Sequence, residues 1–520
     1  MRSDPRELHW RGFDLVVIGA GIQGAAIARD ASLRGLSVLL VEKRDVAAGT
    51  SSRSSRLVHG GLRYLRSGHV SLVREALAER ELLLRLAPHL VRPQPMLMPF
   101  FRGGGLPRWQ LRIGTWLYSK LAGRSTLPKP RRLSATDAVE AFPGLRTEGL
   151  RSALEFQDAR TDDARLTLAN VFGAVAAGCR FVNHVEVVSW DGQGVVLVDR
   201  IGTEQVEVRV HARKVVNAAG PAVDRVRRAL GIDGEPLVRT TRGSHVVLPE
   251  RAGELALAAF LPDKRIQFVV PHAGGTLCGT TDVDDPLEGN ETGPPREDLK
   301  YLQEALGWLL DPAPQLRDMQ FAYAGWRALP AVKGPAGGLN REAFLVDEQV
   351  SGGTVHTVVG GKLTTHRSFA ERVVAKLFDL SAPSPTRTLA LPGGDGPREV
   401  DDPLWWRHGS RVSALREFMR ENPETAEPLC PHRPFLVAEL VQAVRHEGAV
   451  RFADVMLRRL THVMGPCLDS SCLLRAHLWY LRESPVLVDE DSHSAVAAVR
   501  REVAEMTGDL SPRTGERTES

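Results

Sequence analysis

The stretch Phe13 to Glu42, FDLVVIGAGIQGAAIARDASLRGLSVLLVE, decides the fold of this chain. It opens with a short apolar run at 13–18, which is typical of a parallel strand buried on both faces. Three glycines follow at Gly19, Gly21 and Gly24. The first permits a tight turn, the second leaves room for a pyrophosphate against the backbone, and the third lets the next helix pack on the sheet. The stretch therefore predicts a dinucleotide-binding unit.

The second half of the unit supplies the remaining parts. A helix is expected from Ile22 to about Arg34, and the apolar run at 37–41 predicts a second strand. Glu42 follows 18 residues after Gly24, at the tip of that strand. A carboxylate in this place can accept both ribose hydroxyls and disfavours a 2′-phosphate. The unit alone leaves NAD and FAD open.

The loop that follows favours FAD. Residues 46–61, VAAGTSSRSSRLVHGG, are rich in small and hydroxyl side chains. Such a loop is suited to wrapping an extended cofactor that stays bound, whereas a nicotinamide carrier must leave at each turnover. The same loop brings His59 close to the expected flavin, where we interpret it as a loop-fixing hydrogen-bonding residue. A covalent flavin link through His59 stays open.

Seven local strings, in this order, are similar to those of the FAD-dependent sn-glycerol-3-phosphate dehydrogenase family. They are GAGIQGAAIARDASLRGLSVLLVE, TSSRSSRLVHGGLRYL, TDDARLTLAN, VNAAGPAVD, RGSHVVLP, GTTDVD and GGKLTTHR. The resemblance covers about 14–378 and continues more weakly into the C-terminal region. It implies oxidation of sn-glycerol 3-phosphate to dihydroxyacetone phosphate by bound FAD, with a quinone as the electron acceptor in the respiratory members.

Composition bounds the class of protein. The chain has 520 residues, 43% of them apolar and 25% charged, which predicts a globular protein of two or three domains. Its net charge of +4 is too small to argue for nucleic acid. The five cysteines, at 179, 278, 430, 467 and 472, are scattered and include no CxxC. They indicate neither a disulfide framework nor a metal site, and a reducing compartment fits best.

The expected fold class is α/β. Strand-like runs at 181–190, 195–200, 206–210 and 214–220 predict more of the sheet of the first domain, and runs between 237 and 347 predict a mixed or antiparallel sheet. We expect a discontinuous Rossmann-like FAD-binding domain (1–95, 150–235 and 350–380) and a mixed-sheet substrate domain (96–149 and 236–349). A linker (381–398), an all-helical C-terminal domain (399–508) and a disordered tail (509–520) are expected to follow.

Neither a secretory signal nor a membrane-spanning segment is apparent, so a cytoplasmic protein is expected. Residues 107–122, PRWQLRIGTWLYSKLA, nevertheless place tryptophans and leucine near one helical face with cations beside them. This pattern suits peripheral contact with the inner face of the cell membrane, where a quinone would be the acceptor. A helix packed inside the protein explains the pattern equally well, and a homodimer stays open.

Three cations are candidates for binding a phosphorylated substrate. Arg63, followed by Tyr64, comes just after the glycines at 60–61, and a guanidinium suits bidentate capture of phosphate or a developing alkoxide. Arg327 stands in an apolar strand, where a buried cation requires an anionic partner, either substrate or a structural carboxylate. Lys362 is expected to open a helix after Gly361, beside the flavin and its developing negative charge.

Two histidines complete the predicted substrate site. His245 lies in an alternating strand and is our candidate for the proton acceptor, because histidine titrates near neutrality unaided. Burial in the core with a backbone partner is the commoner fate of such a residue. His366 stands where relatives carry tyrosine, and Ala328 where they carry proline. We expect the imidazole of His366 close to the substrate phosphate, with an effect on affinity or its pH dependence.

The expected catalytic residues are therefore His245, Arg327 and Arg63, and the substrate-binding residues add Tyr64, Lys362 and His366. Val187 is expected to meet the adenine through its backbone. The full set of expected cofactor contacts is Ile18, Gly19, Gly21, Ile22, Gln23, Gly24, Glu42, Lys43, Ser51, Ser52, Ser55, Leu57, His59, Gly60, Gly61, Val187, Ala218, Ala219, Gly220, Gly361, Lys362, Leu363 and Thr364.

Other functions remain in view. An oxidase acting on the same substrate would pass its electrons to oxygen, and the sequence does not decide oxygen access. An amine or 2-hydroxy-acid flavoenzyme of the same fold would need cations placed for a carboxylate. A flavin-bound sensor without activity is the non-enzyme alternative, against which the presence of Arg63, Arg327 and Lys362 argues.

Overall fold

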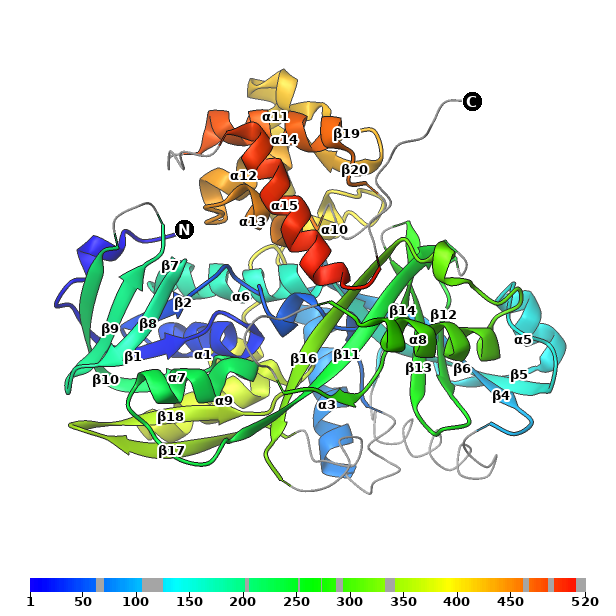
Figure 1. Cartoon of the computed structure of the whole chain (residues 1–520), viewed down its shortest axis with the longest axis horizontal. Helices are drawn as coiled ribbons and strands as arrows, with labels where there is room; N and C mark the ends of the chain where they lie inside the picture. The colour runs from blue at the N-terminus through cyan, green and yellow to red at the C-terminus, as the bar shows by residue number, and fades with distance from the viewer. Residues whose placement is uncertain are drawn as a thin grey trace.

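The structure is a computed structural model that describes residues 1–61, 70–104, 125–201, 205–250, 253–272, 274–286, 293–332, 342–461, 467–484 and 491–510. Two sheet-based parts lie side by side, and a helical C-terminal part lies across both (Figure 1). Arg63, Tyr64 and residues 107–122 fall outside the described residues, so the functions expected of them stay predictions.

The first part is built on the predicted dinucleotide-binding unit. Strand β1 (Gly12–Ile18), helix α1 (Ile22–Leu33) and strand β2 (Val38–Glu42) follow one another as expected. The sheet order is β17-β18-β10-β1-β2-β7, and the pairings among β18, β10, β1, β2 and β7 are parallel. The remaining strands are β7 (Arg180–Asn183), β8 (Val185–Trp190), β9 (Gly194–Asp199), β10 (Glu207–Asn217), β17 (Phe344–Val350) and β18 (Gly353–Val359).

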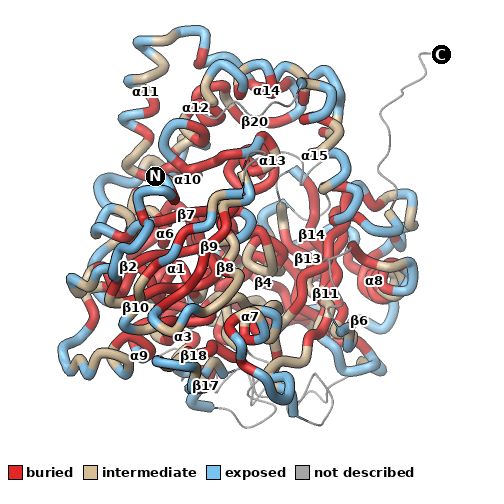
Figure 2. Tube along the Cα trace, turned by 60° about the vertical axis from the view of Figure 1, so that its left-hand side comes forward, coloured by how far each residue is buried: buried red, intermediate tan, exposed pale blue. Residues whose placement is uncertain are grey.

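Both faces of this sheet are covered, which explains why β1 and β2 are almost continuously apolar. One face packs against α1, α6 (Asp163–Ala176) and α9 (His366–Phe378). The other face packs against the strands β8 and β9. Figure 2 shows this layered region, around α1, β2 and β9, as largely buried, as it does the second sheet around β13 and β14. The carboxyl ends of the parallel strands are thus left as the open edge, where ligands bind in such sheets.

The second part is a ten-stranded sheet with the order β15-β11-β14-β13-β12-β4-β6-β3, in which β16 also pairs with β11 and β5 with β6. Helices α5 (Ala135–Ala141) and α8 (Arg296–Leu309) pack on one face, and α3 (Val70–Leu86) on the other. Its strands are β3 (Leu57–Val58), β4 (Val91–Phe101), β5 (Arg131–Ser134), β6 (Leu150–Thr161), β11 (Val238–Pro249), β12 (Ala256–Phe260), β13 (Ile266–His272), β14 (Gly275–Gly279), β15 (Val283–Asp284) and β16 (Phe321–Pro330).

Two of the expected domain boundaries are wrong. Residues 150–161 were assigned to the FAD-binding domain, but β6 pairs with β4 along its length in the second sheet. The chain returns to the first domain only at α6, whose N-terminus is capped by the side chain of Asp162. Residues 344–349 were assigned to the substrate domain, but β17 extends the first sheet by pairing with β18. The sheet of β6 is decided by a partner that is distant in sequence, whereas β17 forms a hairpin with β18 and so follows that strand into the first sheet.

The segment expected to be a linker, 381–398, packs against the first domain instead. Ser384, Thr386 and Leu391 are buried, and the hydroxyl of Ser384 hydrogen-bonds the carboxylate of Asp30 in α1. Arg29 of the same helix donates to the carbonyl of Leu389 at 2.9 Å. Polar groups on α1 thus hold a segment that composition alone assigns to a linker.

The C-terminal part is largely helical, with α10 (Trp405–His408), α11 (Val412–Glu421), α12 (Val437–His446), α13 (Phe452–Asp454), α14 (Ser470–Glu483) and α15 (Ser492–Thr507). The expectation of an all-helical domain misses a small hairpin, β19 (Pro428–Cys430) with β20 (Arg433–Leu436). The core of this part includes Phe321 and Tyr323 from β16, so it is continuous with the second sheet. Within the described residues, no helix is long and apolar enough to cross a membrane.

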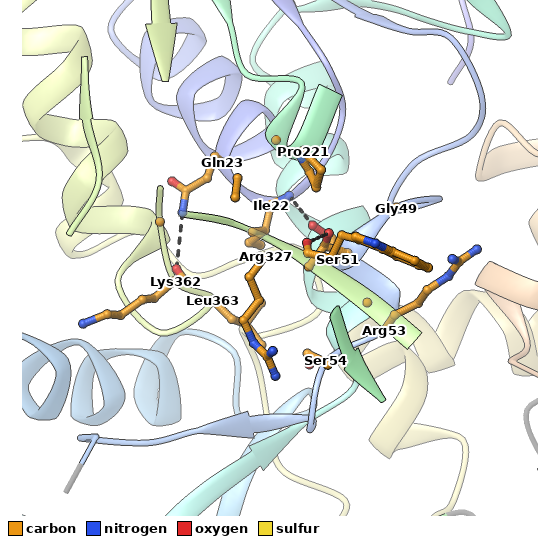
Figure 3. Close-up of a pocket in the computed structure, with 18 of the residues that line it drawn as sticks. Ile22, Gln23, Gly49, Ser51, Arg53, Ser54, Pro221, Arg327, Lys362 and Leu363 are labelled. Carbon is orange, nitrogen blue, oxygen red and sulfur yellow. Dashed lines mark hydrogen bonds between the residues drawn. The ribbon is translucent and has the colours of Figure 1, made fainter. Parts of the chain in front are cut away.

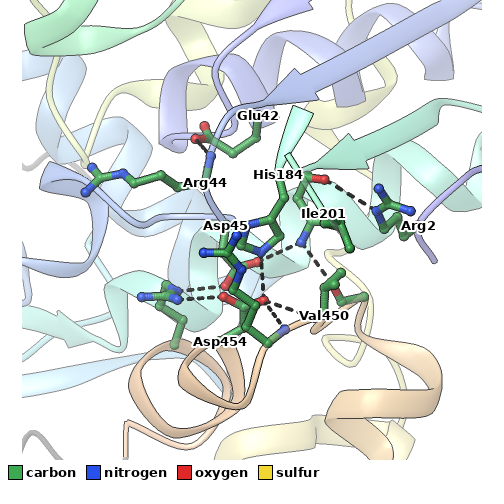
Figure 4. A network of polar contacts seen from close by, with 12 residues as sticks. Arg2, Glu42, Arg44, Asp45, His184, Ile201, Val450 and Asp454 are labelled. Atoms are coloured by element: carbon green, nitrogen blue, oxygen red, sulfur yellow. Dashed lines mark hydrogen bonds and ion pairs between the residues drawn. The ribbon is translucent and has the colours of Figure 1, made fainter. Parts of the chain in front are cut away.

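A buried network of charges joins the C-terminal part to the first domain (Figure 4). Asp45, in the loop after β2, accepts hydrogen bonds from Arg458 at 2.7 Å and from Arg459 at 2.6 Å. Asp454 accepts from Arg458 and from the His184 ring, at 2.7 and 2.9 Å. The two aspartates are fully buried. Each buried charge has a partner of opposite charge, which offsets the free energy of removing it from water. The network therefore fixes how the C-terminal part packs on the first domain.

Asp45→Asn tests this network. The substitution keeps the shape of the side chain but leaves the guanidinium of Arg459 without its buried carboxylate, so we expect a loss of about 3–5 kcal/mol in the free energy of unfolding. Glu155→Gln is the control, because Glu155 pairs with Arg131, which is 68% exposed, at 2.8 Å. It should cost about 0–1 kcal/mol. Urea unfolding followed by tryptophan fluorescence measures both, and equal losses would contradict the interpretation.

Candidate active site

A cavity of about 990 Å³ lies between the carboxyl edge of the first sheet and the second sheet. Its volume is at the upper end of the usual range for ligand sites, about 300–1,000 Å³. The first wall is formed by the β1–α1 turn and the ends of β2 and β10, and Figure 3 shows part of this region. The second wall carries apolar side chains from the second sheet, namely Met96, Met98, Phe156, Ala258 and Phe268.

The β1–α1 turn has the form that a pyrophosphate requires. Gly19 has a φ of +105°, which favours glycine, and a Cβ on Gly24 would lie 1.9 Å from the carbonyl oxygen of Gly19. At Gly21 a Cβ would approach the Ser51 hydroxyl to 3.2 Å, and that hydroxyl accepts a hydrogen bond from the Ile22 amide at 2.9 Å. The turn and the loop after β2 thus form one cradle at the N-terminus of α1, where anions are favoured.

Glu42 lies at the adenosine end of the cavity. Its carboxylate accepts the backbone N–H of Ala20 and of Arg44, each at 2.8 Å, which fixes its orientation. A carboxylate has about four acceptor sites in all, so two amide donors leave capacity for ribose hydroxyls. Lys43 and Val187 also line this end. The residues present therefore fit the adenosine half of a dinucleotide.

Arg327 lies at the centre of the site. It is partly buried on β16, and its guanidinium donates to the Thr280 hydroxyl at 2.8 Å and to the Asp282 carboxylate at 3.2 Å. Gly243 on the neighbouring strand makes room for it, because a Cβ there would lie 2.1 Å from Nη2 of Arg327. The partner that a cation in this apolar strand requires is therefore a structural carboxylate, which leaves the guanidinium fixed at the cavity.

His245 lines the same cavity and is 2% exposed. Its Nε2 lies 2.8 Å from the hydroxyl of Ser55, and its ring stacks on Tyr323 with centroids 5.0 Å apart. Burial, and then the positive charge of Arg327, lower the pKa of His245 to about 3. The imidazole is neutral at physiological pH and is held in one orientation, as a proton acceptor requires.

A second polar cluster lies behind His245, and sequence reasoning missed it. Tyr323 donates its hydroxyl to the carbonyl of Ser54 at 2.6 Å, and the Ser54 amide donates to Asp163 at 3.0 Å. Asp163 is also 3.7 Å from Arg56, and burial raises the pKa of this carboxyl against the opposing effect of Arg56. Asp163 stands in the string TDDARLTLAN, whose family resemblance gave no role to this residue. The cluster fixes the loop that carries Ser55.

The structure corrects two expectations for the loop at 360–366. Lys362 does not open a helix, because α9 begins at His366. Its side chain extends away from Arg327 in Figure 3, while its carbonyl accepts from Gln23 at 3.3 Å. The charge of Lys362 acts instead on Glu75 of α3. Burial raises the pKa of Glu75, but its partners Arg372, Ser368 and Lys362 together lower this pKa below its ordinary value.

His366 does not reach the cavity. It is 1% exposed, its Nδ1 lies 2.7 Å from the carbonyl oxygen of Leu363, and its Nε2 lies 3.4 Å from the Asn170 side chain. Burial lowers the pKa of His366 to about 4. The expected contact with substrate is not formed, and the residue acts in the core between α6 and α9.

Most of the expected cofactor contacts lie on the cavity surface. The exceptions are Gly24, Ser52, Gly60 and Gly61, which lie behind it and shape the turn and the loop. Those on the surface are Ile18, Gly19, Gly21, Ile22, Gln23, Glu42, Lys43, Ser51, Ser55, Leu57, His59, Val187, Ala218, Ala219, Gly220, Gly361, Lys362, Leu363 and Thr364. Sequence reasoning missed three cations that also line the cavity. Arg53 stands in the family-like string TSSRSSRLVHGGLRYL but was not singled out, and Lys264 and Arg265 stand in none of the seven strings.

Comparison with known proteins agrees with this site. The family model of FAD-dependent oxidoreductases matches residues 14–367, and that of the C-terminal domain of alpha-glycerophosphate oxidase matches residues 356–466. A glycerol-3-phosphate dehydrogenase from Synechocystis is 34% identical over 507 residues, covering 89% of this chain and 91% of the relative. The chain belongs to the FAD-dependent glycerol-3-phosphate dehydrogenase family. The expected family, fold class and cofactor, FAD, are thereby confirmed.

Two further relatives bear on this family member. The crystal structure of glycerol-3-phosphate dehydrogenase from Bacillus halodurans, complexed with FAD, matches with a TM-score of 0.74 at 27% identity, covering 98% of this chain and 97% of that one. D-erythritol 1-phosphate dehydrogenase from Brucella abortus is 37% identical over 477 residues, covering 87% of this chain and 94% of the relative. Two polyol phosphates, glycerol 3-phosphate and D-erythritol 1-phosphate, thus appear in the names of these relatives.

The depressed pKa of His366 gives a prediction for stability. The folded state keeps this ring neutral down to a pH of about 4, whereas the unfolded chain protonates it below about 6.5. The free energy of unfolding should therefore fall as pH drops from about 6.5 to 4, by up to about 1.4 kcal/mol per pH unit for this one proton. His366→Asn, which can keep the Nδ1 hydrogen bond, should flatten that dependence.

Urea midpoints between pH 7 and pH 4.5 measure the effect. His493→Asn is the control, because His493 is exposed in the first turn of α15. Its slope should equal that of the unsubstituted protein. Equal slopes for His366→Asn and the unsubstituted protein would show that His366 is not kept neutral by burial.

Proposed function

We propose that this protein oxidises the C2 hydroxyl of sn-glycerol 3-phosphate to give dihydroxyacetone phosphate. The observation that carries the proposal is the pairing of a fixed cation, Arg327, with a neutral buried imidazole, His245, on the wall of a cavity built for FAD. Bound FAD supplies the acceptor for the hydride. The two protein groups supply what the rest of the reaction needs, a site for negative charge and a site for the proton.

Arg327 is proposed to bind the anionic part of the substrate. Its hydrogen bonds to the Thr280 hydroxyl, the Thr281 carbonyl and the Asp282 carboxylate orient the guanidinium at the cavity wall. A planar, oriented donor of this kind suits phosphate or a developing alkoxide. Arg63 is proposed to add a second cation, and Tyr64 to assist it, on the strength of the family resemblance.

His245 is proposed to take the hydroxyl proton. The ring is neutral, so its lone pair is available, but a pKa of about 3 makes it a weak base before substrate binds. An anionic substrate beside the ring raises the pKa of an imidazole, because the negative charge favours the protonated form. Ser55 keeps the ring oriented in either protonation state, since a hydroxyl both donates and accepts.

The electron acceptor is proposed to be a quinone at the inner face of the cell membrane, reached through peripheral contact by residues 107–122. The support is the aromatic and cationic pattern of that segment. Oxygen is the second candidate, and the match of the C-terminal region to a glycerophosphate oxidase domain favours testing it.

Anaerobic mixing with glycerol 3-phosphate tests the proposal. The yellow absorbance of the flavin in the purified holoprotein should disappear on the time scale of one catalytic turnover. Glycerol, which lacks the phosphate, should leave this absorbance unchanged. An unchanged spectrum with glycerol 3-phosphate would instead support a flavin-bound sensor. Reoxidation in the presence of a soluble quinone, compared with reoxidation by air alone, separates dehydrogenase from oxidase.

D-erythritol 1-phosphate is a second candidate substrate, because a relative named for it is 37% identical over 477 residues. It differs from glycerol 3-phosphate by one more carbinol unit, so the extent of the cavity beyond Arg327 decides between them. The ratio of kcat/KM for the two substrates under one set of conditions measures this preference. A ratio above one for the longer substrate would overturn the first assignment while leaving the reaction class in place.

Gly243→Ala tests the position of Arg327 without changing any charge. The added Cβ would overlap the Arg327 guanidinium, so the arginine must move from its place. Loss of charge-assisted hydrogen bonds worth about 1.5–3 kcal/mol predicts a rise in KM for the phosphorylated substrate of about 10- to 100-fold. The content of bound FAD should stay the same.

Gly12→Ala is the matched control, because no atom lies within 4 Å of a Cβ built at Gly12, on the far side of the first sheet. Its KM should equal that of the unsubstituted protein. If Gly243→Ala also leaves KM unchanged while a melting curve shows an intact fold, Arg327 does not bind the substrate.

A further inference from the structure

Four potential metal ligands meet in the C-terminal part of the chain, although they are far apart in the sequence. Cys430 ends β19, His432 stands in the hairpin turn, and Cys467 and Cys472 flank the start of α14. Their ligand atoms all lie within 4.8 Å of one another. Three of the five cysteines, which are scattered in the sequence, therefore come together in the fold.

Four of the six distances between these atoms can be compared with the edges of a tetrahedron. The sulfurs of Cys430 and Cys467 are 3.8 Å apart. Nδ1 of His432 lies 3.3 Å from the sulfur of Cys467, 3.6 Å from that of Cys472 and 4.0 Å from that of Cys430. An ion bound tetrahedrally at about 2.3 Å from sulfur and about 2.0 Å from nitrogen requires edges of about 3.8 Å between sulfurs and about 3.5 Å between sulfur and nitrogen.

We propose that Cys430, His432, Cys467 and Cys472 bind a single structural zinc ion. Three thiolates and one imidazole are a ligand set that zinc favours, and the four fill its coordination sphere, so no position remains open for catalysis. A two-iron cluster would need the ligands in two pairs on two separate ions, and the cage of 4.8 Å is too small for that arrangement. A disulfide between two of the cysteines would leave the convergence of the third cysteine and the histidine unexplained.

The surroundings are suited to sulfur anions. The backbone N–H of His432 donates to the sulfur of Cys430 at 3.3 Å, and the Asp469 amide donates to that of Cys467. Cys472 lies in the first turn of α14, where amide groups favour negative charge. Three thiolates on a divalent ion carry a net charge of −1, and the buried guanidinium of Arg433 lies near enough to Cys430 and Cys467 to offset it.

The site would tie the hairpin to α14 and so close the core of the C-terminal part. Leu429 and Phe435, on either side of Cys430 and His432, belong to the same core as Phe321 and Tyr323 of the second sheet. Tyr323 in turn stacks on His245. The ion would therefore stabilise the packing of the hairpin on α14, separated from His245 by the core that contains Tyr323. Its loss should destabilise the C-terminal part first.

Metal analysis of the full-length holoprotein tests the proposal and does not depend on its activity. Protein expressed with zinc in the medium and purified without chelators should contain about one zinc per chain by inductively coupled plasma mass spectrometry. His432→Asn and Cys472→Ser should each contain less than about a fifth of that amount. Cys179→Ser is the control, because Cys179 is buried in the first domain away from the cluster, and it should keep its zinc.

Two measurements on the unsubstituted protein cover the case in which the variants fail to fold. Titration with a thiol-reactive mercurial in the presence of a zinc indicator should release about one zinc as the thiols react. Protein loaded with cobalt should show the intense visible absorption of a tetrahedral cobalt site with thiolate ligands. Zinc-free protein from zinc-supplemented cells, iron with an equal amount of acid-labile sulfide, or a Cys430–Cys467 disulfide in protein purified under reducing conditions would each overturn the proposal.

Discussion

The close approach of backbone at the β1–α1 turn is the constraint on which the rest of the structure depends. A Cβ on Gly24 would lie 1.9 Å from the carbonyl of Gly19, and one on Gly19 would lie 2.8 Å from the carbonyl of Ala218 at the end of β10. Only glycine lets α1 begin this close to the strand and lets β10 end beside it. The parallel order of β10, β1 and β2 and the position of the cavity at their ends follow from that contact.

This local constraint explains which parts could be predicted. The glycine turn and Glu42 depend on residues near one another in sequence, and the structure has each where the sequence places it. The start of α9 could not be read in the same way, because Gly361 suggests a helix opening at Lys362 while the helix begins at His366. That shift turns His366 into the core and directs Lys362 away from Arg327.

The parts that could not be predicted depend on pairing over long distances. Arg327 is oriented by Thr280 and Asp282, which come from a turn on the other side of β11. Tyr323 becomes part of the site only because β16 pairs with β11, which sets it opposite His245. The four metal ligands meet only when β19 and α14 are packed together. Cys467 and Cys472 stand at a C-x4-C spacing that occurs in zinc sites, but their partners Cys430 and His432 lie more than 30 residues away in the sequence. In each case the residue gains its position from a partner that is distant in sequence.

The C-terminal part illustrates how a domain without obvious chemistry can still set the geometry of an active site. It is held to the first domain by the buried charges around Asp45 and to the second sheet by the apolar core that includes Tyr323. A rigid packing of this kind on two sides leaves the two sheets little freedom to separate. The cavity lies between those sheets, with the cofactor cradle on one wall and His245 and Arg327 on the other. The C-terminal helices do not line this cavity, yet they help to fix the distance between its two walls.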